Sequence, residues 1–296
     1  MVLLRAGIYI LAAFFTGLFL MGLGRKITAR LQRRYGPPLW QPLYDIAKLF
    51  SKRTNISHGL MMDFSVIILL GGTLLSLFFL PNPYFKDFLA SADIIVLLYL
   101  LLLPSLGMAL GVGEVANPNG SIGISRALIM LLGYDFTLLA VVVGLSLAYG
   151  GNTYFVDIVS QQGGSFIHWN LFRFPLFALA AFFATLGMLK LEPFEVMVAP
   201  HEIATGPMVE FGGRYLGMLF LQYSFALFIE IGIFVNLFLG GGGIILFTLK
   251  VISVFVVGVL VNNIFACFRT EQAVKFFWKY PLVLSLAGII MVMAGK

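Results

Sequence analysis

Residues 24–53 read GRKITARLQRRYGPPLWQPLYDIAKLFSKR and separate two long apolar stretches. From Arg25 to Arg53 this segment holds eight Lys or Arg residues and a single acid, Asp45. A short loop of a membrane protein that carries so many cations stays on the cytoplasmic side. We therefore expect residues 25–62 to form a cytoplasmic loop.

The second half of this loop predicts a helix that lies along the membrane surface. Helical spacing places four apolar side chains on one stripe, namely Leu39, Leu43, Ile46 and Phe50. A short helix with one apolar face and a basic remainder rests in the interface rather than crossing it. The loop is then a platform on which another protein docks.

Apolar runs fill most of the remaining chain. Of its 296 residues 60% are hydrophobic and 11% charged, and the mean hydropathy is +0.99. Runs of about 18 residues or more predict membrane-spanning helices, because a spanning backbone must satisfy its own hydrogen bonds. Eight such runs occur, at about 3–24, 63–80, 93–112, 127–149, 172–190, 215–239, 244–267 and 281–295. We expect an all-α integral membrane protein, a single polytopic domain over 1–296, whose first run is retained rather than cleaved.

The distribution of charge predicts the orientation and excludes one class of partner. With loop 25–62 inside, fourteen of the nineteen Lys and Arg residues fall on inside loops. This bias accounts for the net charge of +6 without nucleic acid. Both termini then face outward from the plasma membrane, and the odd-numbered loops, including an acidic loop over 190–214, are cytoplasmic.

The sequence contains no self-sufficient catalytic or metal site. Cys267 is the single cysteine, which excludes an internal disulfide and a cysteine-ligated cluster held by this chain alone. The three histidines lack metal-ligand spacing, and Gly240–Gly243 is a turn rather than a phosphate loop. Redox chemistry, if the protein takes part in any, belongs to a partner chain, so whether the chain should be called an enzyme stays open.

Charged residues in or beside the apolar runs are candidates for a proton path. A charge near the middle of a spanning helix costs about 2.5–3.5 kcal/mol on insertion scales, so such residues usually face a bundle interior, pair or carry ions. The candidates are Asp93, Glu114, Asp135, Glu192, Glu195, Glu202, Glu210, Glu230 and Lys250.

Each candidate also has a structural interpretation. Asp93 is suited to cap a helix at the interface. Glu230 and Lys250 are suited to form an ion pair between neighbouring spans. Asp135 is compatible with a hydrogen-bonded core position, and the loop glutamates with a solvated surface. Their number favours a path, since about nine of the thirteen acids occupy spans or the inside loops.

Four groups of residues in chain order resemble the NuoH-type membrane subunit of the complex I superfamily. The first loop carries Arg34-Tyr35-Gly36-Pro37, Gln41-Pro42, Asp45 and Lys48-Leu49. The third loop and fourth span carry Asn117, Gly123, Arg126, Tyr134 and Asp135, with Asp in place of the family's Glu. The fifth loop carries Pro193-Phe194-Glu195, Glu202-Ile203, Gly206 and Glu210-Phe211, and the last stretch carries Lys250, Arg269, Glu271-Gln272 and Trp278-Lys279.

Departures from the pattern favour one branch of that family. Val198 and Pro200 stand where quinone-reducing members carry acids, and Glu192 precedes Pro193 without the family's arginine. Asn262 replaces an arginine, and Tyr223 a carboxylate. The chain is therefore most similar to the counterpart subunit of membrane-bound energy-converting hydrogenases and related sulfane sulfur reductases.

The resemblance implies a core subunit that docks a peripheral arm and couples its electron transfer to proton or sodium translocation. The expected docking residues are Arg25, Arg30, Arg33, Arg34, Gln41, Asp45, Lys48, Arg126 and Arg269. The implied partners are an iron–sulfur small subunit, a hydrogenase-like large subunit, with NiFe in some relatives, and antiporter-like membrane subunits. Iron–sulfur clusters would lie in those partners and not in this chain.

Two alternatives remain open. A quinone-site subunit of an NADH:quinone complex would need an apolar slot between the first and sixth spans. A passive anchor would use its intramembrane charges as structural pairs, so that Lys250→Met with Glu230→Leu would be neutral. Under the coupling hypothesis, Asp135→Asn or Glu202→Gln abolishes pumping.

Overall fold

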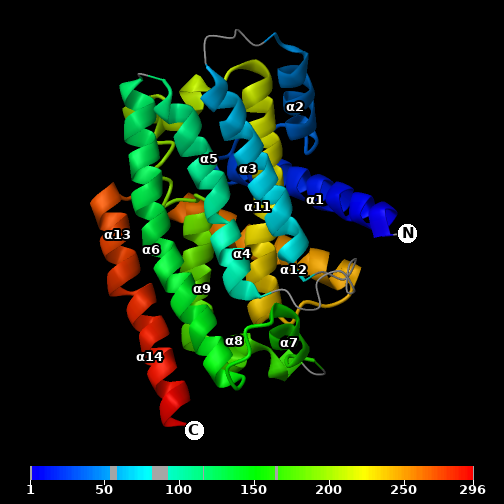
Figure 1. The fold of residues 1–296 in the computed structure, drawn as a ribbon, viewed down its shortest axis with the longest axis vertical. Coiled ribbons are helices and arrows are strands. Elements are labelled where there is room, and N and C mark those ends of the chain that lie inside the picture. The colour runs from blue at the N-terminus through cyan, green and yellow to red at the C-terminus, as the bar shows by residue number, and fades with distance from the viewer. Residues whose placement is uncertain (1, 54–58, 82–92, 116, 164–165, 296) are drawn as a thin grey trace.

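The structure is a computed structural model that describes residues 2–53, 59–81, 93–115, 117–163 and 166–295. The described residues are mostly helical (Figure 1), and among them the sole β feature is an isolated bridge between Asp93 and Tyr154. The α-helices are α1 Val2–Leu31, α2 Gln41–Ser51, α3 Leu60–Phe79, α4 Ile94–Leu100, α5 Leu102–Gly113, α6 Pro118–Ala148, α7 Phe155–Ser160, α8 Asn170–Arg173, α9 Pro175–Met188, α10 Pro200–Ile203, α11 Gly213–Phe238, α12 Ile244–Ile264, α13 Thr270–Lys279 and α14 Pro281–Ala294.

The prediction of an all-α membrane protein is confirmed. Seven helical stretches in the described residues are long and apolar enough to cross a membrane, with α4 and α5 joined as one and α13 and α14 joined as another. The eighth predicted run, 172–190, is represented by the shorter apolar helix α9, which has 14 residues. Because a residue adds 1.5 Å, α9 is about 21 Å long and falls short of a hydrocarbon core of about 30 Å.

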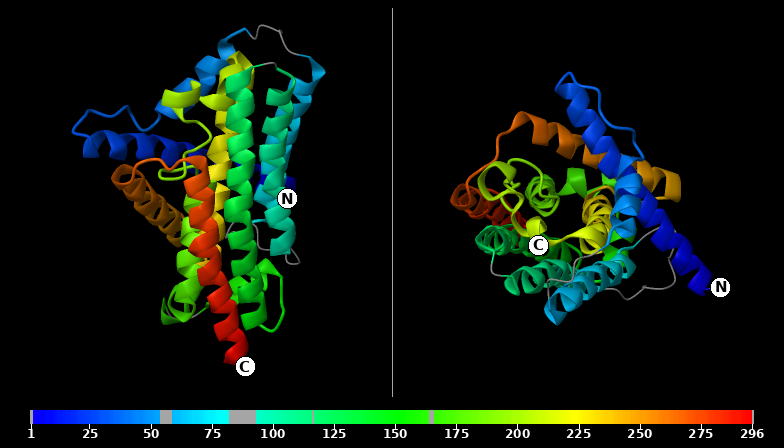
Figure 2. Two further views of the ribbon diagram at one scale, coloured as in Figure 1. Left: turned by 90° about the vertical axis from the view of Figure 1, so that its left-hand side faces the viewer. Right: turned by 90° about the horizontal axis from the view of Figure 1, so that it is seen from above.

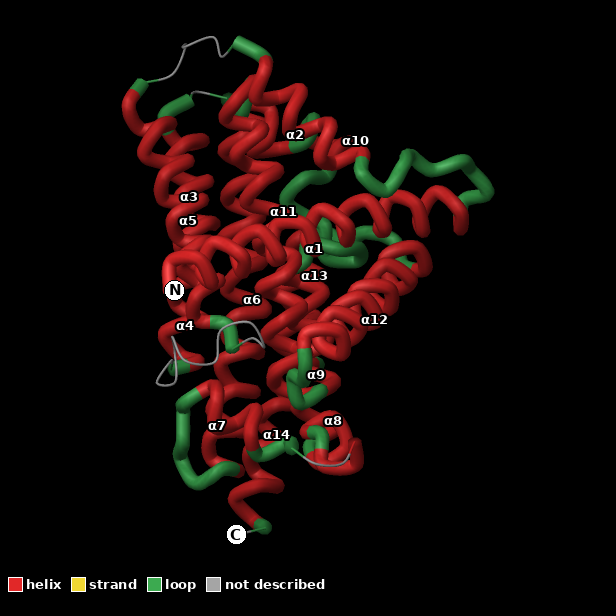
Figure 3. The backbone as a smooth tube through the Cα atoms, turned by 90° about the vertical axis from the view of Figure 1, so that its right-hand side faces the viewer, coloured by secondary structure: helices red, strands yellow, loops and turns green. Residues whose placement is uncertain are grey.

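Most helices follow the long axis of the molecule, but α1 and α12 do not. Figures 2 and 3 show α1 lying across the bundle and α12 steeply inclined beside it. The crossing of α1 over α11 brings the two backbones into contact at Gly17, where an added Cβ would lie 1.9 Å from the carbonyl oxygen of Ser224. A glycine at this position is what permits the crossing.

The two ends of the bundle differ in what they carry. One end, called here the α2 end, carries α2 and α10, and the other, the α7 end, carries α7, α8 and the end of α14 (Figure 1). The short helix α9 starts near the α7 end and stops well below the top of α6. Segment 190–214 therefore begins inside the bundle, where Phe194, Val196 and Met197 are buried.

The amphipathic helix of the first loop is present as α2. Its buried residues are Pro42 and Ile46, and Leu43 and Phe50 pack against the core, whereas Leu39 precedes the helix. The preceding helix α1 continues to Leu31 instead of ending near residue 24, so the loop is shorter than predicted. Residues 54–58 of the predicted loop lie outside the described residues.

Candidate functional site

A small polar cavity, the inner cavity, lies among α3, α5, α6, α9 and α11. Its volume is about 60 Å³, and its charged lining residues are Asp135, Lys190 and Glu230. A water molecule needs roughly 10–15 Å³ of such volume, so several waters fit. Tyr134, Ser105 and Gln222 supply further polar groups, and the remaining walls are mostly apolar. The cavity is suited to hold a short water chain between two carboxylates.

Asp135 and Glu230 reach this cavity from different helices. Asp135 lies midway along α6 and Glu230 on the second half of α11. Both side chains are partly buried. Within the described part of the chain neither carboxylate has an ion pair or a hydrogen bond. Buried polar groups normally have a protein or water partner, and the inner cavity has room for water beside both carboxylates.

Lys190 is the residue of this cavity that sequence reasoning missed, since it was counted among the inside-loop cations. It follows α9 with φ +53°, a left-handed conformation. Its side chain lines the inner cavity together with the carboxylates of Asp135 and Glu230. No local signal distinguished it from the other inside-loop cations, because it closes the apolar run 172–190, which is long enough in the sequence to be predicted as a span.

A second and larger cavity, the outer cavity, adjoins the first. It has a volume of about 290 Å³ and lies between α1, α11, α12 and the start of segment 190–214. Its polar lining residues include Arg25, Lys190, Glu195, Gln222, Tyr223 and Asn262. Burial and the neighbouring carboxylate of Glu192 raise the pKa of Glu195. Lys190, Met108 and Gln222 line both cavities and so form the wall between them.

Two of the predicted docking residues, Arg25 and Asp45, join α1 to α2, and a third, Gln41, supports Asp45 from within α2. Arg25 Nη1 donates to Asp45 Oδ2 at 2.8 Å, and Gln41 Nε2 donates to Asp45 Oδ1 at 3.0 Å. Burial raises the pKa of Asp45, but these hydrogen bonds and the two nearby cations outweigh it and lower the pKa below its usual value. Arg25 thus lines the outer cavity and contacts α2, while 38% of its side chain stays exposed.

The other predicted docking residues with basic side chains in this segment are exposed. Arg30 lies over the ring of Tyr35 with 5.1 Å between its Cζ and the ring centroid, and Tyr35 itself is 94% exposed. Arg33, Arg34 and Lys48 are exposed as well, and Arg34 donates to the side chain of Gln32.

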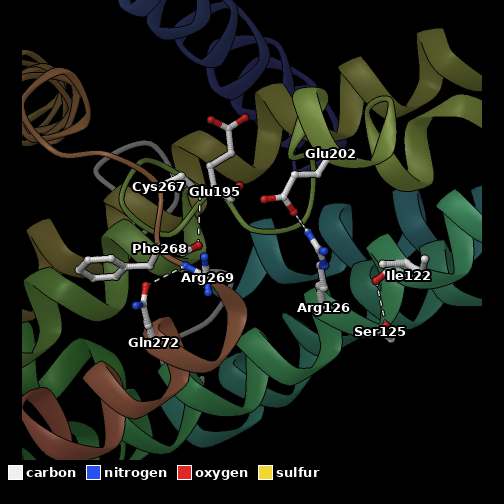
Figure 4. A network of polar contacts seen from close by, with 9 residues as sticks. All are labelled: Ile122, Ser125, Arg126, Glu195, Glu202, Cys267, Phe268, Arg269 and Gln272. Carbon is white, nitrogen blue, oxygen red and sulfur yellow. Dashed lines mark hydrogen bonds and ion pairs between the residues drawn. The ribbon is translucent and has the colours of Figure 1, made fainter.

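Arg126 and Arg269, the last two predicted docking residues, flank a polar groove of about 620 Å³ near the start of α13 (Figure 4). Arg126 Nη1 donates to Glu202 Oε2 at 2.7 Å, which ties α6 to segment 190–214. Arg269 is the residue before α13, and its backbone N–H donates to Gln272 Oε1 at 3.2 Å. Burial and the surrounding acids raise the pKa of Cys267, whose thiol contacts the carbonyl of Glu195.

Three more proton-path candidates hold helix ends. Asp93 accepts from the backbone N–H of Ile95 at 2.9 Å and from Thr153 Oγ1 at 3.1 Å, as expected of a capping residue. Glu114 accepts from the N–H of Met62 at 2.9 Å. Glu210 accepts from the side-chain amide of Asn117, the N-cap of α6.

Glu192 and Lys250 complete the candidate set. The backbone N–H of Glu192 donates to Asn262 Oδ1 at 2.7 Å, and burial raises the pKa of its carboxyl group. Lys250 lies at the α7 end, where its Nζ donates to the carbonyl oxygens of Leu239 at 2.5 Å and Gly241 at 2.7 Å. It forms no ion pair with Glu230 in the described residues. The structure therefore brings together Asp135, Glu230 and, across one wall, Glu195.

Comparisons with known proteins identify the family of the chain. A family model described as NADH dehydrogenase matches residues 4–293. The chain is similar to the NuoH-type subunit of the NADH-quinone oxidoreductase of Helicobacter acinonychis, with 29% identity over 96% of this chain and 94% of the relative. It is also similar to hydrogenase-4 component C of Escherichia coli, with 29% identity over 83% of this chain and 82% of that protein.

A solved structure matches as well. It is a chain from the membrane-bound sulfane sulfur reductase, an archaeal respiratory membrane complex, with a TM-score of 0.92 and 39% identity. The match covers 98% of this chain and 99% of that one.

Proposed function

Since the chain belongs to the NADH dehydrogenase family of NuoH-type membrane subunits, we propose that it is the coupling subunit of a complex-I-like redox complex. In this proposal it docks a peripheral electron-transfer arm and passes the effect of electron transfer to ion translocation in the membrane. It is a membrane-complex subunit related to those of hydrogenases and a sulfane sulfur reductase. The observation that carries the proposal is the inner cavity, beside the outer cavity, whose two carboxylates have no hydrogen bond or ion pair within the described residues.

The chemistry of the inner cavity supports proton transfer. A carboxylate without a direct partner, set among apolar helices, exchanges protons with water more readily than one held in an ion pair. Asp135 and Glu230 lie on separate helices, so the cavity continues between them. We assign proton exchange to these two residues and to Glu195 in the outer cavity.

The exposed surface of the first loop supports docking of the arm. Arg30, Tyr35 and Tyr44 are exposed near the start of α2, and arginine and tyrosine are enriched at protein interfaces. We propose that the α2 end faces the cytoplasm and binds an iron–sulfur small subunit with its hydrogenase-like large subunit. Antiporter-like subunits would bind elsewhere on the membrane-embedded surface.

Substitution of Asp135 in the intact complex tests the coupling role. The complex is purified, reconstituted into vesicles and assayed for electron transfer and for ion uptake. Asp135→Asn should reduce the number of ions moved per electron at least tenfold, because an amide cannot exchange a proton. Asp135→Glu is the matched control and should restore at least half of the ratio. A normal ratio in Asp135→Asn contradicts the proposal.

Charge reversal tests the docking role. Arg30→Glu together with Arg34→Glu should reduce the amount of peripheral subunits that copurify with the chain. Arg173→Glu, at the α7 end, is the matched control and should leave copurification unchanged. Equal loss in both variants, or loss in neither, contradicts docking at the α2 end.

The outer cavity favours one second candidate, a quinone-site subunit. It lies between α1 and α11, the first and sixth spans, and its apolar walls include Met21, Phe220 and Phe255. Quinone-site inhibitors that protect a cysteine introduced at Leu227, a cavity residue, from alkylation would support this candidate. Absence of protection at saturating inhibitor would contradict the quinone-site candidate and favour the coupling role proposed above.

A further inference from the structure

The backbone around Lys190 follows a helix-ending motif that normally uses glycine. The N–H of Leu191 donates to the carbonyl of Leu186 at 3.2 Å, and the N–H of Lys190 donates to the carbonyl of Gly187 at 3.2 Å. These two bonds define a Schellman motif, whose left-handed position is most often glycine because a Cβ is disfavoured there. Lys190 occupies that position with φ +53°. The chain therefore accepts backbone strain to place a lysine at this point, and such strain concentrates at functional sites.

The position of Lys190 in the bundle suggests what the side chain does. It belongs to the wall between the inner and outer cavities and lines both of them. The inner cavity holds Asp135 and Glu230, and the outer cavity holds Glu195. The other residues shared by the two cavities, Met108 and Gln222, carry no charge. Lys190 is thus the one cation among the described residues that faces carboxylates on both sides of this wall.

We propose that Lys190 is a positioning residue whose ammonium group moves between Glu230 in the inner cavity and Glu195 in the outer cavity. This inference rests on the proposed coupling function and names the element that links the two cavities. In the present structure Lys190 and Glu230 line the same cavity, and the two groups form no ion pair within 4 Å. The four-carbon stem of lysine is flexible enough for such a movement, which a rigid guanidinium makes less easily.

The movement changes where a proton is held. While the ammonium group is beside Glu230, that carboxylate stays charged. When a change in the outer cavity draws the ammonium group toward Glu195, Glu230 binds a proton from the water of the inner cavity. Return of the ammonium group releases that proton toward Asp135. Tyr134 lies beside the inner cavity and Tyr223 and Arg25 line the outer one, so these are the other ionisable groups close to the path.

Lys190→Gly separates this role from a structural one. Glycine relieves the left-handed strain, so thermal unfolding of the chain in the purified complex should occur at an equal or higher temperature. The ratio of ions moved per electron should nevertheless fall at least tenfold. If the only role of Lys190 is to end α9, the Lys190→Gly variant should keep full coupling. Arg33, which ends α1 in the same motif with φ +57°, supplies the matched stability control in Arg33→Gly.

Two further variants complete the test in reconstituted vesicles. Lys190→Arg keeps the charge and should recover part of the coupling, and it serves if Lys190→Gly fails to assemble. Because Lys190 acts through Glu230, adding Glu230→Gln to Lys190→Gly should cause no further loss. Full coupling in Lys190→Gly, with coupling lost in Asp135→Asn, overturns the role of Lys190 alone. Full coupling in both overturns the proposed function as well.

Discussion

Two lysines within the bundle, Lys250 and Lys190, occupy contrasting surroundings. Lys250 lies at the α7 end and donates to two backbone carbonyls beyond the end of α11, with its Nζ 4.3 Å from the centroid of the Trp169 ring. Lys190 has no hydrogen bond from its ammonium group in the described residues and lines two cavities. Lys250 is therefore held by hydrogen bonds, whereas the Lys190 side chain borders two cavities.

The same contrast holds for the polar residues around each lysine. At the α7 end Gln162 Nε2 donates to the carbonyls of Asn236 and Leu237 at 2.9 and 3.0 Å, and Asn170 Nδ2 donates to Leu237 at 2.8 Å. We call Gln162, Asn170 and Lys250 the polar cap of α11. The cap satisfies carbonyls that a helix end leaves without partners. Buried polar groups with full partners rigidify a fold, whereas groups left to water can change partners.

Loss of Lys250 should have the largest effect on stability. Lys250→Met removes two charge-assisted hydrogen bonds and leaves two buried carbonyls without a donor, at a cost of about 3 kcal/mol. Thermal or denaturant unfolding of the purified chain in detergent measures this loss. Coupling per electron in the folded fraction should stay normal. Normal stability combined with lost coupling would mean that Lys250 belongs to the proton path. The contrast between Lys250 and Lys190 would then not hold.

Loss of Gln162 should have the next largest effect. Gln162 is 2% exposed and bonds two carbonyls at the end of α11, so Gln162→Leu should cost about 2 kcal/mol. Its neighbour Gln161 is exposed, and Gln161→Leu should change the free energy of unfolding by less than about 0.5 kcal/mol. Equal effects of the two substitutions would show that the polar cap contributes no stability.

Much of the fold follows from the sequence because its signals are local. Apolar runs and the basic segment predicted the spans and α2, since length and charge decide both. The length of α9 was missed, because residues 172–190 are apolar almost throughout while Phe174 and Pro175 end one helix and begin another. That shortening takes the start of segment 190–214 into the bundle, and no local pattern reports it.

The site followed from the sequence less completely. Composition identified Asp135 and Glu230 as costly charges, and the structure places both in one cavity. Composition could not separate them from Asp93, Glu114 and Glu210, which hold helix ends, because capping depends on which backbone N–H lies nearby. Nor could composition show that Glu230 shares a cavity with Lys190 rather than Lys250, because the position of Lys190 depends on where α9 ends.

Neutral substitutions in the inner cavity should barely change stability, in contrast to those in the polar cap. A buried carboxylate without a partner destabilises a fold, so an amide of the same shape replaces it at little cost. We expect Glu230→Gln and Asp135→Asn to change the free energy of unfolding by less than about 1 kcal/mol, in the stabilising direction if at all. Unfolding measurements at neutral pH check this. Losses as large as those of Lys250→Met would place these residues in a structural network instead.

The smallest effects should appear as opposite pH dependences of two carboxyl groups. The pKa of Asp45 is lowered by its hydrogen bonds despite burial, so its contribution to stability is present above its unfolded pKa of about 3.9 and is lost as pH falls through the lower folded value. The pKa of Glu195 is raised by burial and by Glu192, so its cost is absent at low pH and grows as pH rises above about 4.3. Relative to Asp45→Asn the parent should therefore gain stability between acid and neutral pH. Relative to Glu195→Gln it should lose stability over the same range. If the two differences in unfolding free energy changed with pH in the same way, the hydrogen-bonded and the cavity carboxylate would not differ.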